Sequence, residues 1–302
     1  IVAHKDGDKL FYSNGFETGI YENGQDRTLG LARPANPPAM VATSGDFGTG
    51  RVICACSFLR NDGQESGLSS IGLLESDDGG ISFSNIPVST DSTVDGVRIY
   101  LTHPNGEVLY LALTVPNGVT TSEFRGRREF LTRPQTTMYL NRPQAFDDID
   151  LANARMLYMS GEYLFYSPPF AYELIDPRFG WIRLDGRMTN VGVVRDGVFV
   201  STEKSTWYLA GADIKDARPK KVAGYGGIPR TRVYVEASLL GGDLGNGLLP
   251  MWSTKGGFVI GADSGELINI SDKNFNLPAG ITGTAMFRQE EGQNHYIAVL
   301  QS

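Results

Sequence analysis

The chain has 302 residues, of which 41% are hydrophobic, 20% are charged and 37 are glycine, a composition that supports an apolar core, excludes a disordered chain and indicates frequent turns. Its 34 acidic residues outnumber 27 Lys and Arg, and the formal charge of −7 argues against sequence-independent wrapping of nucleic acid, which needs a basic surface. The best apolar run, Val108 to Val115, is far shorter than the roughly 18 residues of a membrane span, so we expect a soluble protein with no membrane span.

Short apolar or alternating runs follow one another from the N-terminus, where Ile1 has no methionine before it and no signal-peptide pattern follows. Whether the numbering begins after a cleavage point stays open. Turn dipeptides separate the runs: Asn23-Gly24, Asp62-Gly63, Gly79-Gly80, Asn105-Gly106, Asn117-Gly118 and Ser264-Gly265. Runs of this kind, punctuated this often, are typical of antiparallel sheets joined by hairpins, so the predicted fold class is all-β.

Residues 38–125 differ from the rest of the chain in their pattern of apolar and polar residues. A stiff, proline-rich stretch, Arg33–Pro38, leads into them. Their alternating runs predict about six or seven short strands, including a hairpin of Val97–Thr102 with Glu107–Val115. A segment of this size with that many strands is typical of a β-sandwich of the fibronectin or immunoglobulin type. We therefore predict an inserted sandwich domain at 38–125.

The two cysteines, Cys54 and Cys56, lie in an apolar run within this segment. In a strand, residues two apart point to the same face, roughly 7 Å from each other, which is near or beyond the limit for a disulfide. A lone C-x-C pair without a nearby histidine is also a poor zinc site. We interpret both residues as core thiols, consistent with assembly in a reducing cytosol.

Ser76–Phe83 (SDDGGISF) matches the S-x-D-x-G-x-S-F pattern of the Asp box, a motif found on hairpins of sialidase-like propellers. In such a turn the aspartate accepts backbone hydrogen bonds and a glycine takes positive φ, so the motif is structural and not catalytic. It occurs once here, whereas sialidases generally repeat it. We interpret it as a coincidental hairpin, with kinship to sialidases as the alternative.

The best helical signal is Asp147–Tyr158, which predicts one or two helical turns or a loop leading into a strand. Its three acidic residues, Asp147, Asp148 and Asp150, suggest a calcium site but lack the register of a calcium loop. We interpret them as a solvated loop or helix start.

Other polar residues fit no chemical site. His4, His103 and His295 have no metal-ligand spacing and are interpreted as surface or packed residues. The glycine-rich Ser44–Gly50 lacks the Lys-Ser/Thr ending of a phosphate loop and is interpreted as an ordinary loop. We therefore predict no catalytic residue, no cofactor site and no metal site.

Two internal similarities suggest a repeated unit. Asp6–Asn14 and Ser160–Pro168 share a Leu-Phe-Tyr-Ser sequence, and Asp196–Gly211 parallels Gly256–Ser271 as a strand, a polar turn and a second strand. Repeated hairpins of this size are typical of β-propeller blades. Because the Leu-Phe-Tyr-Ser sequence occurs on both sides of 38–125, we predict a discontinuous propeller-like domain formed by 1–37 and 126–302.

Aromatic residues crowd one short region between Tyr163 and Trp181. Core packing accounts for those that alternate along a strand. The loop Ser167–Asp176 is the exception, and we predict that it forms an exposed aromatic patch at an interface between subunits.

Several segments together resemble virion structural proteins of tailed bacteriophages, most closely the tail nozzle or head-to-tail connector proteins of short-tailed phages. These segments are Asn61–Ser69, Gly161–Phe165, Tyr166–Pro168, Tyr172–Leu174, Asp176–Arg178, Asp185–Met188, Asp196–Thr202 and Gly292–Tyr296. The resemblance is one of pattern and order along most of the chain. It implies a non-enzymatic subunit with a propeller-like body, in a ring that is commonly hexameric, beneath the portal and adaptor proteins and in contact with other tail proteins.

Such a ring, assembled in the host cytoplasm and carried in the virion, prolongs the conduit through which double-stranded DNA leaves without specific binding. An acidic surface suits that role, because it repels the duplex over a Debye length of ~8–10 Å. Two alternatives stay open: a sialidase-like propeller glycoside hydrolase, and a carbohydrate-binding adhesin.

Overall fold

The computed structural model describes residues 1–77, 79–241, 244–271, 277 and 280–301. Within these residues the regular elements are strands, apart from three single 3₁₀ turns, η1 (Arg128–Phe130), η2 (Ile214–Asp216) and η3 (Ala237–Leu239). The strands form several antiparallel sheets, none of which closes on itself. The predicted all-β class is confirmed.

The chain divides into two compact units, each described here by itself. Unit 1 consists of Ile1–Leu29 and Pro143–Ser302, and unit 2 of Gly30–Arg142. Unit 2 extends beyond the 38–125 segment expected from the sequence. The reason is that Leu31 and Leu131, on either side of that segment, are buried in its apolar core.

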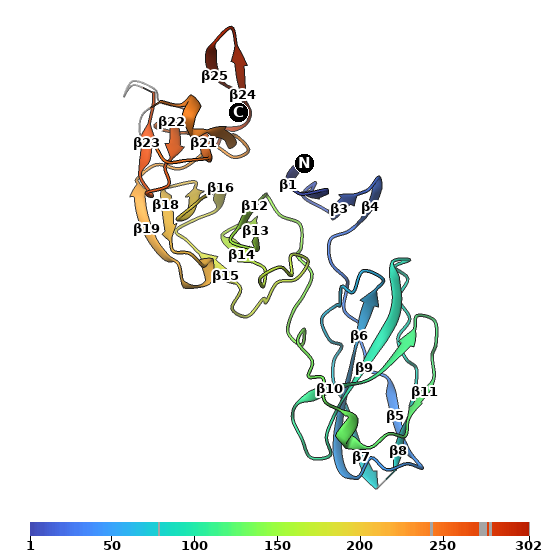
Figure 1. The fold of residues 1–302 in the computed structure, drawn as a ribbon. Helices are drawn as coiled ribbons and strands as arrows, with labels where there is room; N and C mark the ends of the chain where they lie inside the picture. Colours follow the sequence, from blue (N-terminus) through green and yellow to red (C-terminus); the bar gives the residue numbers. More distant parts are fainter. Residues whose placement is uncertain (78, 242–243, 272–276, 278–279, 302) are drawn as a thin grey trace. The chain divides into compact units, whose positions relative to one another are not determined.

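Among its described residues, unit 1 contains four sheets of four strands and one two-stranded sheet, and consecutive strands pair in each of them (Figure 1). The first sheet is β1 (Val2–Asp6), β2 (Lys9–Ser13), β3 (Thr18–Glu22) and β4 (Gln25–Thr28); the second is β12 (Asp148–Ala152), β13 (Arg155–Ser160), β14 (Tyr163–Tyr166) and β15 (Trp181–Arg183); the third is β16 (Met188–Val194), β17 (Gly197–Thr202), β18 (Thr206–Ala210) and β19 (Arg218–Ala223). The fourth is β20 (Val233–Glu236), β21 (Leu248–Thr254), β22 (Gly257–Gly261) and β23 (Leu267–Asn269), and the fifth is the hairpin of β24 (Thr282–Glu290) and β25 (Gln293–Gln301).

Tight turns in the left-handed region set these pairings. Asn23 and Gly24, with φ of 52° and 78°, join β3 to β4 as the sequence predicted. Asn153 and Ala154, with φ of 45° and 63°, join β12 to β13 in the same way. Two positive φ values are the requirement of a type I′ hairpin turn, whose twist matches that of the strands. The helical turns considered for Asp147–Tyr158 are therefore wrong, since that segment is a β-hairpin.

The sheets of unit 1 contact one another in chain order, mainly through their first strands. β1 contacts β12, β12 contacts β16, β16 contacts β21, and β20 contacts β24. Apolar clusters pack between successive sheets, with Phe11 and Ile149 in one, Leu157 and Val198 in the next, and Phe199 and Trp252 in a third. Each sheet of this series therefore covers a face of the next.

The two longer similar segments are both hairpins, as predicted, but they do not occupy equivalent places in their sheets. Asp196–Gly211 contains β17–β18, the second and third strands of the third sheet, whereas Gly256–Ser271 contains β22–β23, the third and fourth strands of the fourth sheet. The two Leu-Phe-Tyr-Ser sequences are not equivalent, because the first lies in β2, a second strand, and the other in β14, a third strand. This local sequence identity thus does not mark the same place in the repeat.

The chain leaves unit 1 after Leu29 and returns at Pro143. Leu29 and Phe146 belong to the same buried apolar cluster, and the Phe146 amide donates a hydrogen bond to Ser13 Oγ at 3.2 Å. The two connections to unit 2 are therefore anchored in one small region of unit 1.

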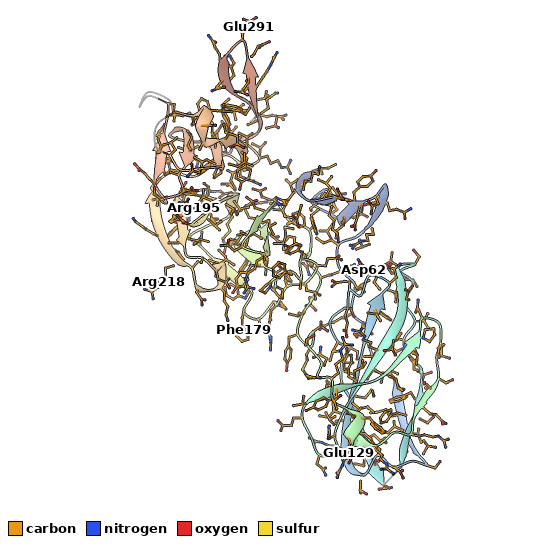
Figure 2. All side chains as sticks on the ribbon, viewed as in Figure 1. Asp62, Glu129, Phe179, Arg195, Arg218 and Glu291 are labelled. Carbon is orange, nitrogen blue, oxygen red and sulfur yellow. The ribbon has the colours of Figure 1, made fainter. Side chains whose placement is uncertain are left out.

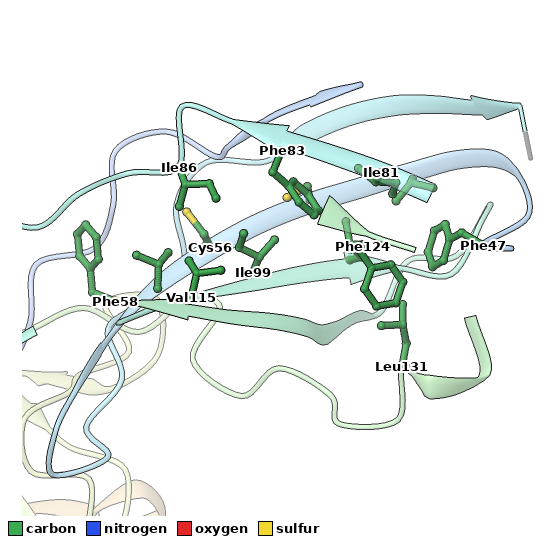
Figure 3. Packing of buried hydrophobic residues seen from close by; sticks show 14 of the residues in the cluster. Phe47, Cys56, Phe58, Ile81, Phe83, Ile86, Ile99, Val115, Phe124 and Leu131 are labelled. Carbon is green, nitrogen blue, oxygen red and sulfur yellow. The ribbon is translucent and has the colours of Figure 1, made fainter. Parts of the chain in front are cut away.

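Unit 2 consists of two sheets that share one apolar core (Figure 3). One sheet has the order β10 (Leu109–Pro116), β9 (Val94–Thr102), β6 (Thr49–Arg60) and β7 (Gly72–Asp77), and the other β11 (Ser122–Phe124), β8 (Gly80–Ser84) and β5 (Ala39–Thr43). The hairpin predicted around Asn105-Gly106 is confirmed as β9–β10. Cys56 and Ile99 from the first sheet pack with Phe83 of the second.

Candidate functional site

A cluster of polar side chains and backbone amides lies where four sheets of unit 1 meet. It joins β1, β12 and β16, the first strands of the first, second and third sheets, with the start of β20. Asp148 and Asp150 lie on one face of β12, and the Arg232 guanidinium binds both, at 2.9 Å from Asp148 Oδ1 and 3.2 Å from Asp150 Oδ2. The Tyr234 hydroxyl donates to Asp150, and His4 Nδ1 of β1 lies 3.4 Å from its Oδ1. We call these five residues the inner cluster.

Backbone amides of β16 complete the partners of the two carboxylates. The Val191 amide donates to Asp148 Oδ2 at 3.1 Å, and the Val193 amide donates to Asp150 Oδ2 at 3.2 Å. The Arg232 guanidinium also donates to the Ile149 carbonyl at 3.0 Å. The inner cluster therefore links β1, β12, β16 and β20, which belong to four different sheets.

The charges of the inner cluster stabilise one another. Burial acts to raise the pKa of Asp150, but the Arg232 charge and hydrogen bonds from His4 and Tyr234 hold that pKa below its usual value. Burial and the Asp150 charge raise the pKa of Tyr234 well above its ordinary value. Asp150 therefore stays ionised and Tyr234 stays neutral near pH 7. With both groups buried and hydrogen-bonded, the arrangement acts as a structural clamp and not as a general acid or base.

The acidic residues of this region were interpreted from sequence as a solvated loop or helix start, and that interpretation is wrong. Asp148 and Asp150 are strand residues whose side chains are 14% and 3% exposed, whereas the Asp147 side chain is 37% exposed and lies 3.4 Å from Arg187. No group of three or more His, Cys, Asp or Glu side chains is placed to hold a metal ion within the described residues. The sequence reasoning missed Arg232 and Tyr234, although their spacing of two on a strand places them on one face, as it does for Asp148 and Asp150.

A second polar group ties the third sheet together. The Asp185 carboxylate accepts hydrogen bonds from Ser205 Oγ at 2.7 Å, Thr202 Oγ1 at 3.0 Å and Trp207 Nε1 at 3.1 Å. It thereby attaches the segment before β16 to the β17–β18 turn. This group is also structural, because each donor belongs to the protein itself.

The two ends of the series of sheets expose apolar side chains. On β24–β25, Phe287 and Tyr296 pack toward the fourth sheet, while Met286, Ile297 and Val299 point the other way and are 52%, 42% and 64% exposed. We call this exposed side the outer face of β24–β25.

The first sheet has the corresponding property at the other end of the series. Phe11 and Ile20 face the second sheet and are buried. Leu10 and Tyr21, which alternate with them and pair directly across β2 and β3, are 36% and 48% exposed. We call this side the outer face of the first sheet.

No family model matches this chain. A search of curated proteins finds no match either. In the part of the chain that the structure describes, no helix is long and apolar enough to cross a membrane.

The Asp box does not lie on a hairpin. The segments that flank it, β7 and β8, pair in different sheets, β7 with β6 and β8 with β5 and β11. Ser76 Oγ donates to the Gly48 carbonyl at 3.1 Å, and Asp78 lies outside the described residues. The coincidental hairpin predicted here is therefore wrong, because the chain passes between two sheets at this point.

The cysteines and histidines lie where the sequence placed them. Cys54 and Cys56 are free and fully buried on β6, and burial raises the pKa of the Cys56 thiol to about 11. His103 packs edge-on against Tyr110, with ring centroids 4.9 Å apart, and His295 is exposed on β25. Ser44–Gly50 ends in β6 and precedes no helix, as expected of an ordinary loop.

The aromatic patch differs from the one predicted. In Ser167–Asp176, Tyr172 packs edge-on against Phe11 in the core, and Phe170 is exposed. The other exposed aromatic side chains follow the loop, and they are Phe179, labelled in Figure 2, and Trp181 on β15. Phe170 has a φ of 59°, a conformation that L side chains rarely adopt. Phe170, Phe179 and Trp181 are therefore the exposed aromatic side chains of this region.

Proposed function

We propose that this chain is a structural assembly subunit, arranged with copies of itself in a ring at the head-to-tail interface or tail nozzle of a tailed phage. The observation that carries the proposal is the outer face of β24–β25, where Met286, Ile297 and Val299 are exposed together. Successive sheets of unit 1 contact one another, and β24–β25 is the last sheet of this series. Contiguous exposed apolar side chains are typical of interaction surfaces.

The two outer faces fit a ring. They are different surfaces, so contact between them in identical subunits is head-to-tail. Head-to-tail contacts generate a closed ring when the rotation from one subunit to the next adds up to a full turn. The occupant we propose for the outer face of β24–β25 is the outer face of the first sheet in a second copy. Such contact continues the sheet-on-sheet packing that already joins the five sheets within one chain.

The same proposal includes a propeller-like fold for the body of unit 1 and a β-sandwich fold for unit 2. Four-stranded meanders that contact one another in chain order support a propeller-like body. Seven described strands in two sheets around a common core support a sandwich of the fibronectin or immunoglobulin type for unit 2. The formal charge of −7 fits a conduit that lets DNA pass without binding it.

Light scattering coupled to size-exclusion chromatography, with negative-stain images, tests the ring. We expect annular particles at ~100 µM chain, alone or with portal and adaptor proteins. Replacing Met286 and Val299 by Asp should leave monomers, because a carboxylate in an apolar contact is costly to desolvate. The matched control is Val108→Asp on unit 2, where Val108 is 52% exposed, and it should assemble normally. Monomers of the unmodified chain under all these conditions would refute the proposal.

The phage context has its own test. Portal and capsid genes beside the reading frame would support it, and a polysaccharide-utilisation cluster would contradict it. The adhesin alternative rests on the exposed aromatic side chains Phe170, Phe179 and Trp181, because exposed aromatic rings can stack on sugars. Glycan-array binding that is lost in Trp181→Ala would favour that alternative. Turnover of fluorogenic glycosides would favour the hydrolase.

A further inference from the structure

A cavity of about 490 Å³ lies in unit 1. Residues of the second, third and fourth sheets, of the segment leading into β24 and of the first position of β24, Thr282, line it. Met159, Met188 and Ile228 are almost fully buried and form its apolar floor. Ligand pockets of this size are usually apolar cavities with a few polar groups, so the polar groups of this cavity decide what it can bind.

The first of these groups is the Thr189 hydroxyl. Thr189 is 4% exposed and lines the cavity, and its Oγ1 is buried with no hydrogen-bond partner among the described residues. It is the extra residue of a β-bulge, since Met188 pairs with Thr202 and Asn190 with Ser201. Bulges redirect side chains and occur often beside binding sites. A buried hydroxyl without a partner costs free energy, so its presence at a cavity indicates a ligand that supplies the missing partner.

The second group is Arg230, which the fold holds at the cavity in a strained conformation. Its φ is 65°, and it follows Pro229 in a turn whose second central position favours glycine or asparagine. The turn is fixed close to β16, because a Cβ on Gly227 would lie 2.6 Å from Asn190 Nδ2. Arg230 is exposed and makes no hydrogen bond or ion pair with any residue that the structure describes. Strain that serves no internal contact is characteristic of binding sites.

The charge balance of the lining is positive, although the chain as a whole is acidic. Arg187 is 3.4 Å from Asp147, whereas the Lys255 ammonium donates to the neutral carbonyl of Glu203 at 2.9 Å. Lys255 and Arg230 therefore contact no carboxylate of the described chain, and Glu203 is the only other acidic residue of the described lining.

We infer that this cavity binds a small organic anion. The carboxylate or phosphate group of this anion accepts hydrogen bonds from Arg230, Lys255 and the Thr189 hydroxyl. The apolar part of the anion packs against the buried methionine and isoleucine side chains of the cavity. This site is independent of the proposed ring, because none of these residues lies on either outer face.

Saturation-transfer NMR on the full chain tests the inference with three probes that share an aromatic body: phenyl phosphate, benzoate and the neutral benzyl alcohol. We expect one or both anions to bind at millimolar concentration and benzyl alcohol to bind at least tenfold more weakly, as loss of a charged hydrogen bond predicts. The tighter anion identifies the ligand as a phosphate or a carboxylate. Equal binding of all three probes, or no binding of either anion at roughly 20 mM, would overturn the inference.

Two substitutions localise the binding without unfolding the protein. Arg230→Gly removes the guanidinium and suits the positive φ, and Thr189→Val removes a hydroxyl that has no internal partner, so neither should lower the midpoint of unfolding. Arg230→Gly should weaken anion binding roughly tenfold and Thr189→Val roughly threefold to tenfold. Thr189→Ser, which keeps the hydroxyl, and Arg218→Ala, at an exposed arginine remote from the lining and labelled in Figure 2, should bind normally. Unchanged binding by Arg230→Gly would place the anions elsewhere and refute this site.

Discussion

The two units are stabilised in different ways. Unit 2 has one large apolar core, in which both cysteines are fully buried, and a small second cluster that includes Leu68 and Tyr100. Unit 1 divides its apolar contacts among several smaller clusters and joins four of its sheets through the charged inner cluster. Loss of apolar volume should therefore affect unit 2 most, whereas loss of a charge or a fall in pH should affect unit 1 most.

Two intrinsic probes follow the units separately. The three tryptophans, Trp181, Trp207 and Trp252, all lie in unit 1, so tryptophan fluorescence reports its unfolding. Cys54 and Cys56, the only cysteines, lie in unit 2, so thiol reactivity reports the opening of that unit. One denaturation experiment with both probes thus compares the two units within the same chain.

The largest expected effect is that of Arg232→Ala. It leaves Asp148 and Asp150 without their cation, and breaking a buried ion pair in this way costs about 3–5 kcal/mol. The urea midpoint followed by tryptophan fluorescence should fall, with little change in the thiol-monitored midpoint. The control is Arg195→Ala, at an arginine that is 62% exposed, which should cost less than about 1 kcal/mol. A fall confined to the thiol-monitored transition would contradict this account of the inner cluster.

Leu101→Ala tests the corresponding feature of unit 2. Leu101 is fully buried on β9, and removing such a side chain costs about 2–5 kcal/mol through lost burial and the cavity left behind. Thiol reactivity should appear at lower urea, while the fluorescence midpoint stays in place. Leu73→Ala on β7, where the side chain is 60% exposed, should change stability by no more than about 0.5 kcal/mol. Similar effects from both substitutions would show that the core is not organised as described.

A fall in pH should destabilise unit 1 more than unit 2, but by less than the two substitutions above. Burial acts to raise the pKa of Asp150, but the Arg232 charge and the hydrogen bonds that Asp150 accepts lower it by more. The pKa of Asp150 in the folded chain is therefore below its pKa in the unfolded chain. The stability gained is therefore present above about pH 4 and lost as pH falls through the lowered pKa. Between about pH 5 and pH 3 the fluorescence midpoint should fall more than the midpoint measured with a dithiodipyridine reagent, which reacts in acid. In Asp150→Asn the fluorescence midpoint should be lower at neutral pH and less sensitive to pH; unaltered pH sensitivity would argue against this role of Asp150.

The smallest expected effect is a gain in stability from Ala154→Gly in the β12–β13 turn. Ala154 has a φ of 63°, a conformation that costs a non-glycine residue about 1–2 kcal/mol, partly offset by the entropy of glycine. The net gain in the free energy of unfolding should be about 0.5–1 kcal/mol, measured by tryptophan fluorescence. The reciprocal change, Gly24→Ala in the β3–β4 turn, should lower stability by a similar amount. A loss of stability in Ala154→Gly would be evidence against the turn geometry.

The sequence was informative where structure depends on neighbouring residues. Turn dipeptides predicted the all-β class, and the apolar run around Cys54 and Cys56 predicted that both thiols lie in a core. Contacts distant in the sequence could not be predicted in this way. Arg232 pairs with Asp148 from 84 positions away, and no local pattern indicates that pairing.

The connections between sheets could not be predicted from neighbouring residues either. β5 pairs with β8 across the intervening β6 and β7, so the Gly79-Gly80 turn signal that predicted a hairpin marks a change of sheet. Unit 2 extends beyond the strand-rich segment because Leu31 and Leu131 enter its core from outside that segment.

The shared anchoring of Leu29 and Phe146 has a consequence for how the protein can change over evolution. Since one apolar cluster holds both the exit and the return of the chain, replacing residues 30–142 by a short flexible linker or by an unrelated domain keeps both anchors in unit 1. We therefore expect the position between Leu29 and Pro143 to tolerate loss or exchange of the inserted unit while the remaining sheets keep their order.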